Sequence, residues 1–210
     1  MVALNNELRA TARAQLKGKW GTPILICFIY GIISLAVSFI PGIGGVASLI
    51  LTGPLTLGLV TFTLKFSNEE SVEVSNLFDG FNNFVAALGL YLWMSLWIFL
   101  WSLLLIVPGI IKSFSYSMSF YILSENPQLG AKEALNLSKQ ITKGYEGKIF
   151  ILGLSFIGWM LLAGLTLGIG FLWLMPYIQI TFANLYKELK TEAVANGSFN
   201  TSVASNAVSS

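Results

Sequence analysis

The feature that most constrains this chain is a long apolar stretch, residues 149–186, that contains no charged residue. A glycine-rich break at residues 167–170 divides it near its middle. An α-helix rises ~1.5 Å per residue, so each flank comes close to the ~30 Å hydrocarbon thickness of a bilayer. The stretch therefore predicts a transmembrane hairpin.

Charge is scarce along most of the chain. Of 210 residues, 55% are hydrophobic and 10% are charged, whereas soluble domains carry about 25% charged residues. No charge occurs between Pro23 and Leu64, and only Lys112 occurs between Val85 and Leu123. A soluble core of this size does not need such long apolar runs, so the composition predicts an integral membrane protein. The net charge of +2 is too small to indicate a nucleic-acid partner.

Apolar segments predict an all-α fold: a polytopic membrane helical bundle with six transmembrane helices arranged as three hairpins. The predicted spans are residues 23–40, 46–64, 84–107, 110–123, 149–167 and 171–186. The fourth is the shortest, at ~21 Å as a helix, and its Lys112 either snorkels to the headgroups or has a functional role. Gly53-Pro54 and Gly58 are expected to kink the second span and to allow close helix approach.

A short amphipathic helix is expected before each hairpin. Residues 1–22 form a basic amphipathic segment, interpreted as a helix in the membrane interface or, alternatively, as a solvated leader. Its apolar stripe is Leu4, Leu8, Ala12, Leu16 and Trp20. Spacings of three and four predict the second helix within residues 74–84. Asn126-Pro127 resembles an N-cap with a first-turn proline, which predicts that the third helix follows it and stops at Gly144.

Basic residues predict the orientation. The six-span membrane domain, residues 23–190, places both termini and both long loops on one side, and residues 191–210 are expected to be a disordered polar tail. Eleven of the twelve basic residues lie on the side of the termini, and only Lys112 lies opposite. These eleven are Arg9, Arg13, Lys17, Lys19, Lys65, Lys132, Lys139, Lys143, Lys148, Lys187 and Lys190. The positive-inside rule therefore predicts a multi-pass protein of the cell membrane with both termini in the cytoplasm.

The hairpin turns recur at similar intervals, at Pro41, Pro108 and Gly168. Fixed periods indicate duplicated units, and units of the same orientation would be related by an axis along the membrane normal. Three hairpins that converged on one pattern without duplication are the alternative.

Several motifs are similar to those of a known family. In the C-terminal half they are Leu154-Ser155-Phe156-Ile157-Gly158-Trp159, Leu165-Thr166-Leu167-Gly168-Ile169-Gly170, Leu172-Trp173 and Pro176-Tyr177. Earlier motifs are Gly53-Pro54, Leu77-Phe78-Asp79-Gly80-Phe81, Asn126-Pro127, Glu133-Ala134-Leu135, Ser138 and Gly144. With them the chain, over about residues 1–190, resembles a bacterial integral-membrane family, mostly from Gram-positive organisms, termed domain of unknown function, family 975. The resemblance implies a polytopic helical bundle and brings no established activity.

Enzymatic chemistry finds little support in the sequence. A membrane hydrolase needs a nucleophile with a base, or metal ligands. The chain has no histidine, and all ten acidic residues fall in predicted cytosolic segments. One acidic cluster is either a solvated face or a divalent-ion site; it comprises Glu69, Glu70, Glu73 and Asp79. We therefore expect no enzyme, with no catalytic residue, no cofactor and no resident metal.

Two function classes remain. The first is a non-enzymatic membrane protein that engages lipids or protein partners, including a second copy of the chain, through its basic cytosolic helices. Its candidate contacts are Arg9, Arg13, Lys17, Lys132, Lys139 and Lys143. The second is a permease component or carrier for a small or amphiphilic substrate. It would use a polar path along the last span, made by Pro176, Gln179, Thr181 and Asn184, although helix packing also explains these residues.

Overall fold

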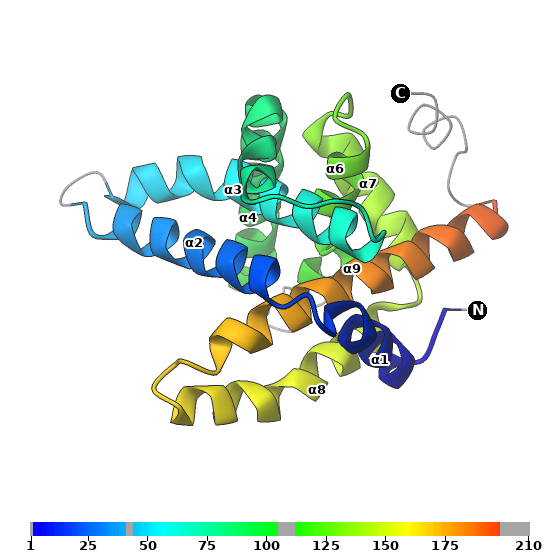
Figure 1. Cartoon of the computed structure of the whole chain (residues 1–210). Coiled ribbons are helices and arrows are strands. Elements are labelled where there is room, and N and C mark those ends of the chain that lie inside the picture. The colour runs from blue at the N-terminus through cyan, green and yellow to red at the C-terminus, as the bar shows by residue number, and fades with distance from the viewer. Residues whose placement is uncertain (1, 41–43, 105–111, 198–210) are drawn as a thin grey trace.

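The computed structural model describes residues 2–40, 44–104 and 112–197, and the regular structure within them is helical, as the sequence predicts (Figure 1). The named helices are α1 (Asn5–Leu16), α2 (Gly21–Ser38), α3 (Gly44–Ser67), the 3-10 helix η1 (Val74–Asn83), α4 (Phe84–Leu104), α6 (Ser119–Glu125), α7 (Ala131–Thr142), α8 (Glu146–Leu165) and α9 (Phe171–Ala195). A helical stretch at residues 112–116 precedes α6, and a turn at residues 117–118 separates the two.

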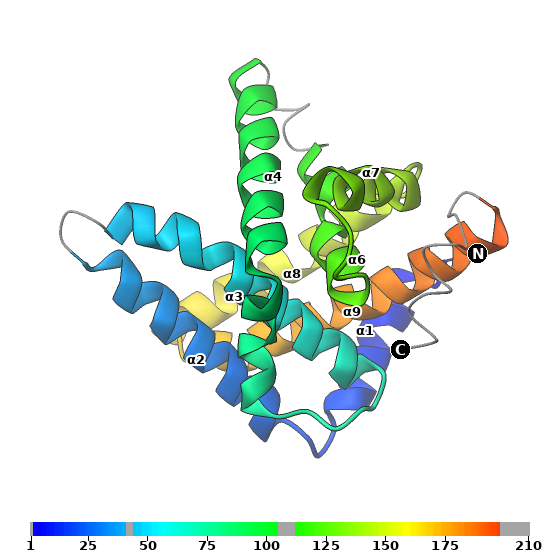
Figure 2. The same cartoon turned by 90° about the horizontal axis from the view of Figure 1, so that it is seen from above.

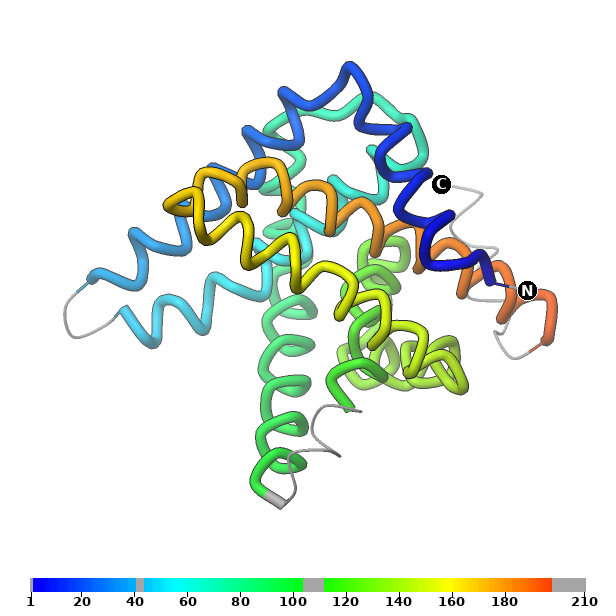
Figure 3. Tube along the Cα trace, turned by 90° about the horizontal axis from the view of Figure 1, so that it is seen from below, coloured from blue at the N-terminus to red at the C-terminus, as the bar shows by residue number. Residues whose placement is uncertain are grey.

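The long helices form three arms around a common base (Figure 2). One arm is α2 with α3, and another is α8 with α9. The third arm leaves the base along α4 and comes back towards it along residues 112–125. In the view from below, the α4 arm points away from the other two, which overlap on the left (Figure 3). Figure 1 shows that the tip of the α8–α9 arm lies below that of the α2–α3 arm.

Four helical segments are long and apolar enough to cross a bilayer, which supports the prediction of a membrane protein. They are Gly21–Ser38, Gly44–Ser67, Val74–Leu103 and Glu146–Leu165. The count of six spans is not confirmed. The predicted span at residues 110–123 lies partly outside the described residues, and within them the turn at residues 117–118 interrupts its helix. Helix α9 covers the predicted sixth span but is not among the four, because polar residues lower its hydropathy.

The buried core lies at the base, whereas the arm tips expose apolar side chains. Helix α3 is buried mainly over residues 53–67, and α9 mainly over residues 180–193. Near the tips, Phe39 is 81% exposed, Leu103 75% and Leu167 95%. Large apolar side chains exposed in this way are unfavourable in water but suited to hydrocarbon. The tips are therefore the parts of the molecule best suited to lipid.

The tightest contact at the base joins α3 to η1. A Cβ added at Gly58 would lie 1.8 Å from the carbonyl oxygen of Leu77, and one added at Gly80 would lie 2.0 Å from that of Pro54. Only residues without a Cβ permit these distances. The predicted close approach at Gly58 is therefore confirmed, and its partner is η1. The helix expected within residues 74–84 is present, in 3-10 form.

Two predicted helix boundaries are wrong. Helix α7 begins at Ala131, with Gly130 as its N-cap, and not directly after Asn126-Pro127. The Asn126 side chain instead donates a hydrogen bond back to the carbonyl oxygen of Ile122 at 3.0 Å, so it caps the end of α6. At the other boundary, α9 continues through residues 191–195, which were expected in the tail. The buried Ala193 gives this extra turn a packing contact. The rest of the tail, residues 198–210, lies outside the described residues.

The three short helices close a ring at the base. Helix η1 packs on α3, α7 packs on α6 and α1 packs on α9. Each short helix thus contacts the last helix of a different arm from the one that it precedes in the chain. Helices α1 and α7 both have 12 residues and both end at Lys-Gly, with φ of +79° at Gly18 and +85° at Gly144. The predicted stop at Gly144 is therefore confirmed. Leu8, Ala12 and Leu16, the buried residues of α1, correspond to buried residues Ala134, Ser138 and Thr142 of α7. These likenesses favour duplication over convergence.

Candidate functional site

The basic residues of α1 divide between two surfaces. The predicted apolar stripe packs on α9 and α3, so most of it contacts protein, although Leu4 at its start is 62% exposed. Arg9 and Arg13 face the α8–α9 arm, where they line a groove of about 480 Å³. Lys17 lines a different hollow, beside Glu69 on the α2–α3 side. Of the candidate contacts Arg9, Arg13 and Lys17, the structure thus brings together only the two arginines.

The groove lined by Arg9 and Arg13, here called the arginine groove, is bounded by α1, α8 and α9. The Nε of Arg13 donates a hydrogen bond to the hydroxyl of Tyr177 at 3.2 Å, and its guanidinium carbon lies 5.9 Å from the centre of that ring. The opposite wall is apolar and includes Trp159 and Trp173. The sequence alone does not indicate this groove, because nothing in the spacing of residues shows that α1 packs on α9 beside the α8–α9 arm.

The lysines of α7 form a separate group. The Nζ of Lys132 lies 4.8 Å from the centre of the Trp93 ring, and that of Lys139 lies 5.3 Å from the centre of the Tyr116 ring. A cation over an aromatic face is stabilised by the negative charge of that face. Lys143 directly follows the helix and is exposed. Two of these three lysines are thus held against the α4 arm.

Asn184, a candidate for the polar path, contributes to helix packing. Its Nδ2 donates to Oε1 of Gln15 at 2.7 Å, and Nε2 of Gln15 donates back to Oδ1 of Asn184 at 3.3 Å. The same Nε2 lies 2.9 Å from the carbonyl oxygen of Ser67. One amide pair thereby joins α1, α3 and α9. Sequence analysis did not single out Gln15, which is the polar partner in this contact.

The other three candidates for the path also lie within α9. The hydroxyl of Thr181 donates to the carbonyl oxygen of Tyr177 at 2.7 Å, one turn earlier in the same helix. Pro176 is buried, and Gln179 is half-buried. The structure therefore places all four residues on one helix, and among the described contacts only Asn184 forms a side-chain hydrogen bond with another helix.

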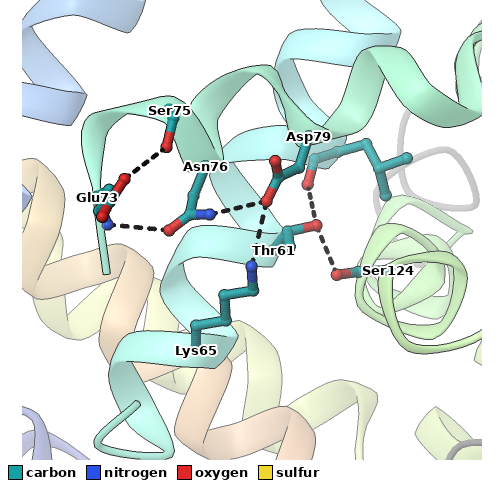
Figure 4. A network of polar contacts seen from close by, with 8 residues as sticks. Thr61, Lys65, Glu73, Ser75, Asn76, Asp79 and Ser124 are labelled. Carbon is teal, nitrogen blue, oxygen red and sulfur yellow. Dashed lines mark hydrogen bonds and ion pairs between the residues drawn. The ribbon is translucent and has the colours of Figure 1, made fainter. Parts of the chain in front are cut away.

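A polar network joins α3, η1 and α6 at the base (Figure 4). Lys65 forms an ion pair with Asp79, with Nζ 3.2 Å from Oδ2, and Nδ2 of Asn76 donates to the same oxygen at 2.9 Å. The hydroxyls of Thr61 and Ser124 lie 2.7 Å apart. A cleft of about 740 Å³ opens beside Thr61, Asp79 and Ser124. Asp79 is thus neutralised by a lysine of α3.

The acidic cluster is dispersed among local structural contacts. Glu73 precedes η1, and its backbone N–H donates to Oδ1 of Asn76 at 2.9 Å, while Ser75 donates to its carboxylate at 3.2 Å. Asn68 donates to the carboxylate of Glu70 at 3.1 Å. Within the described residues, no three metal-ligating side chains converge. The geometry therefore favours a solvated, locally bonded face over a divalent-ion site.

A second ionic contact, which sequence analysis missed, joins α6 to α9. Oε2 of Glu125 accepts hydrogen bonds from the Tyr186 hydroxyl and from Nζ of Lys190, both at 2.6 Å. The Tyr186 ring also stacks on Tyr121, with ring centres 5.3 Å apart. The only sequence signal was a lone acidic residue directly after an apolar segment, and it does not indicate a partner.

Comparison with known proteins places the chain in a family but assigns no activity. The chain matches the family described as "Protein of unknown function (DUF975)" over residues 1–113 and 103–193. This confirms the resemblance seen in the motifs. No curated protein and no solved structure matches the chain.

Proposed function

The chain belongs to this family, and we propose that it is a non-enzymatic integral membrane protein that engages lipid or protein partners at the cytoplasmic membrane. One observation carries the proposal: arms with exposed apolar tips surround a base whose short helices α1 and α7 are basic. A basic helix beside an apolar anchor attracts anionic headgroups. Among possible partners, these residues favour anionic lipid.

We further propose that the chain crosses the cell membrane six times, with both termini in the cytoplasm. Lys112 supports this arrangement, because its Nζ lies 5.4 Å from the centre of the Trp101 ring, far along α4 from the base. The long lysine side chain extends from a short span towards the opposite headgroups. The other basic residues belong to α1, α7 and the base ends of the arms.

Thermal stability in detergent tests the engagement of anionic lipid. Phosphatidylglycerol should stabilise the protein more than phosphatidylcholine does, because only its headgroup carries net negative charge. A lipid present at 100 times its dissociation constant stabilises by about 2.7 kcal/mol, which corresponds to roughly 5–10 °C for a chain of this size.

Two triple variants locate the contacts: Arg9, Arg13 and Lys17 changed to Gln, and Lys132, Lys139 and Lys143 changed to Gln. Loss of the extra stabilisation in either variant supports the proposal. Equal stabilisation of the unsubstituted protein by both lipids would contradict it.

A carrier is the second candidate function, supported by the polar residues of α9. Gln179→Leu and Asn184→Leu separate the two functions. Loss of a cellular phenotype at unchanged protein level would favour a translocation path. Loss of the phenotype on neutralising the α7 lysines would favour binding at the membrane surface. The amide pair of Asn184 with Gln15 supports packing, so we expect Asn184→Leu to lower protein level.

A further inference from the structure

The arginine groove combines two cations with an apolar wall. Arg9 and Arg13 are one turn apart on α1, so they share a face of that helix. Within the described part of the chain, no other charged residue lines the groove. Trp159 and Leu162 of α8, together with Trp173 of α9, form much of the rest. These three side chains are 57%, 56% and 49% exposed, and the groove runs from the arginines at the base to Thr166 and Gly170 near the tip of the arm. The groove is therefore amphiphilic along its length.

The two arginines have unused capacity to bind an anion. Among the described residues, no carboxylate forms an ion pair with either arginine. The Nε of Arg9 is buried and has no hydrogen-bond partner in the described part of the chain. A buried donor without a partner is costly, by about 1–3 kcal/mol. Arg13 donates its Nε to Tyr177, which orients the guanidinium and leaves its terminal nitrogens available.

We propose that the arginine groove binds one anionic phospholipid, with the phosphate on Arg9 and Arg13 and an acyl chain along Trp159, Leu162 and Trp173. Charge complementarity selects the ligand, because an arginine fork matches phosphate oxygens in charge and geometry. The apolar wall selects a lipid over a free anion, since a phosphate ion would leave the indole faces in water. This inference rests on the proposed function and names one site for it.

Tryptophan quenching by brominated lipid tests the site, because bromine on an acyl chain quenches only tryptophans that it touches. The full-length protein in detergent micelles is titrated with brominated phosphatidylglycerol and, separately, with brominated phosphatidylcholine. Each arginine should contribute roughly fivefold to the preference for the anionic lipid. We therefore expect a preference of roughly 25-fold, which Arg9→Gln with Arg13→Gln reduces to about one.

Matched variants separate the groove from the rest of the basic surface. The variant with Lys132, Lys139 and Lys143 changed to Gln should keep the preference. If the lysine variant loses the preference while the arginine variant keeps it, the assignment of the lipid site to the arginine groove is wrong, but the proposed engagement of anionic lipid stands. If the unsubstituted protein shows no preference, both proposals fail.

Three further measurements keep the test decisive if the arginine variant misfolds. Trp20→Phe combined with Trp159→Phe and Trp173→Phe removes the tryptophans that line the groove among the described residues. This variant should lose the anion-selective part of the quenching, and a persistent selective part would place the lipid elsewhere. Tyr177→Phe removes the bond from Arg13 but keeps both charges, so it should retain most of the preference. Glycerophosphate added at millimolar concentration should not compete, and full displacement of the lipid by it would overturn the choice of a lipid ligand.

Discussion

The crossing of α3 and η1 makes Gly58 the position where one methyl group should disturb the base most. In Gly58→Ala the new Cβ would lie 1.8 Å from the carbonyl oxygen of Leu77, about 1.5 Å closer than a usual carbon–oxygen contact of ~3.3 Å. The helices must separate, which opens the packing of the fully buried Leu77 and pulls on the ion pair of Lys65 with Asp79.

The expected cost follows from three contributions. Overpacking costs about 1–3 kcal/mol. Partial loss of the burial of a leucine adds about 1–2 kcal/mol. The higher helix propensity of alanine offsets about 1 kcal/mol. The net destabilisation is therefore about 1–4 kcal/mol, or a fall in Tm of roughly 2–15 °C.

The assay is the loss of the monodisperse peak in size-exclusion chromatography after heating in detergent. Gly153→Ala on α8 is the matched control, because a Cβ there would meet nothing within 4 Å. The control should melt at or above the temperature of the unsubstituted protein. If Gly58→Ala melts with the control, the contact between α3 and η1 is not as close as described, and the packing argument fails.

Three further predictions concern the base and the orientation. Glu125→Gln weakens the contact with Lys190 and should lower the free energy of unfolding by about 1.5–3 kcal/mol. The same heating assay measures this loss, and an unchanged Tm would mean that the 2.6 Å contact adds no stability. Asn184→Leu removes the donor to Oε1 of Gln15 and should cost about 1–3 kcal/mol, although Nε2 of Gln15 keeps its bond to the carbonyl oxygen of Ser67. Asn184→Gln should restore part of that loss, and equal stability of both variants would argue against the amide pair. A reporter fused after Tyr186 should be active only in the cytoplasm, and activity outside would overturn the six-span topology.

Local patterns predicted the elements that depend on local properties. Mean hydropathy along a segment of about 20 residues decides whether a helix is stable in lipid, so α2, α3, α4 and α8 were recognised from composition alone. The stop of α7 at Gly144 was predictable for the same reason, because a left-handed glycine at a helix end is a local preference.

Predictions failed where a neighbour decided the outcome. Asn126 has the residue type of an N-cap, yet its side chain bonds backwards to Ile122, and α7 begins later. The span predicted at residues 110–123 did not fail but is not confirmed: a turn at residues 117–118 interrupts its described part, and α6 beyond the turn is mostly buried in the base. Apolar composition alone does not distinguish burial in lipid from burial in protein, since both exclude water.

The sequence by itself determined that the chain is helical and apolar, with eleven of its twelve cations outside the predicted spans, because these properties depend on residues close together along the chain. Only the tertiary structure decided which distant residues meet. The contact of Arg13 with Tyr177 and the amide pair of Gln15 with Asn184 join positions more than 160 residues apart. Such pairs depend on how α1 closes the ring onto α9, and no local pattern specifies that closure.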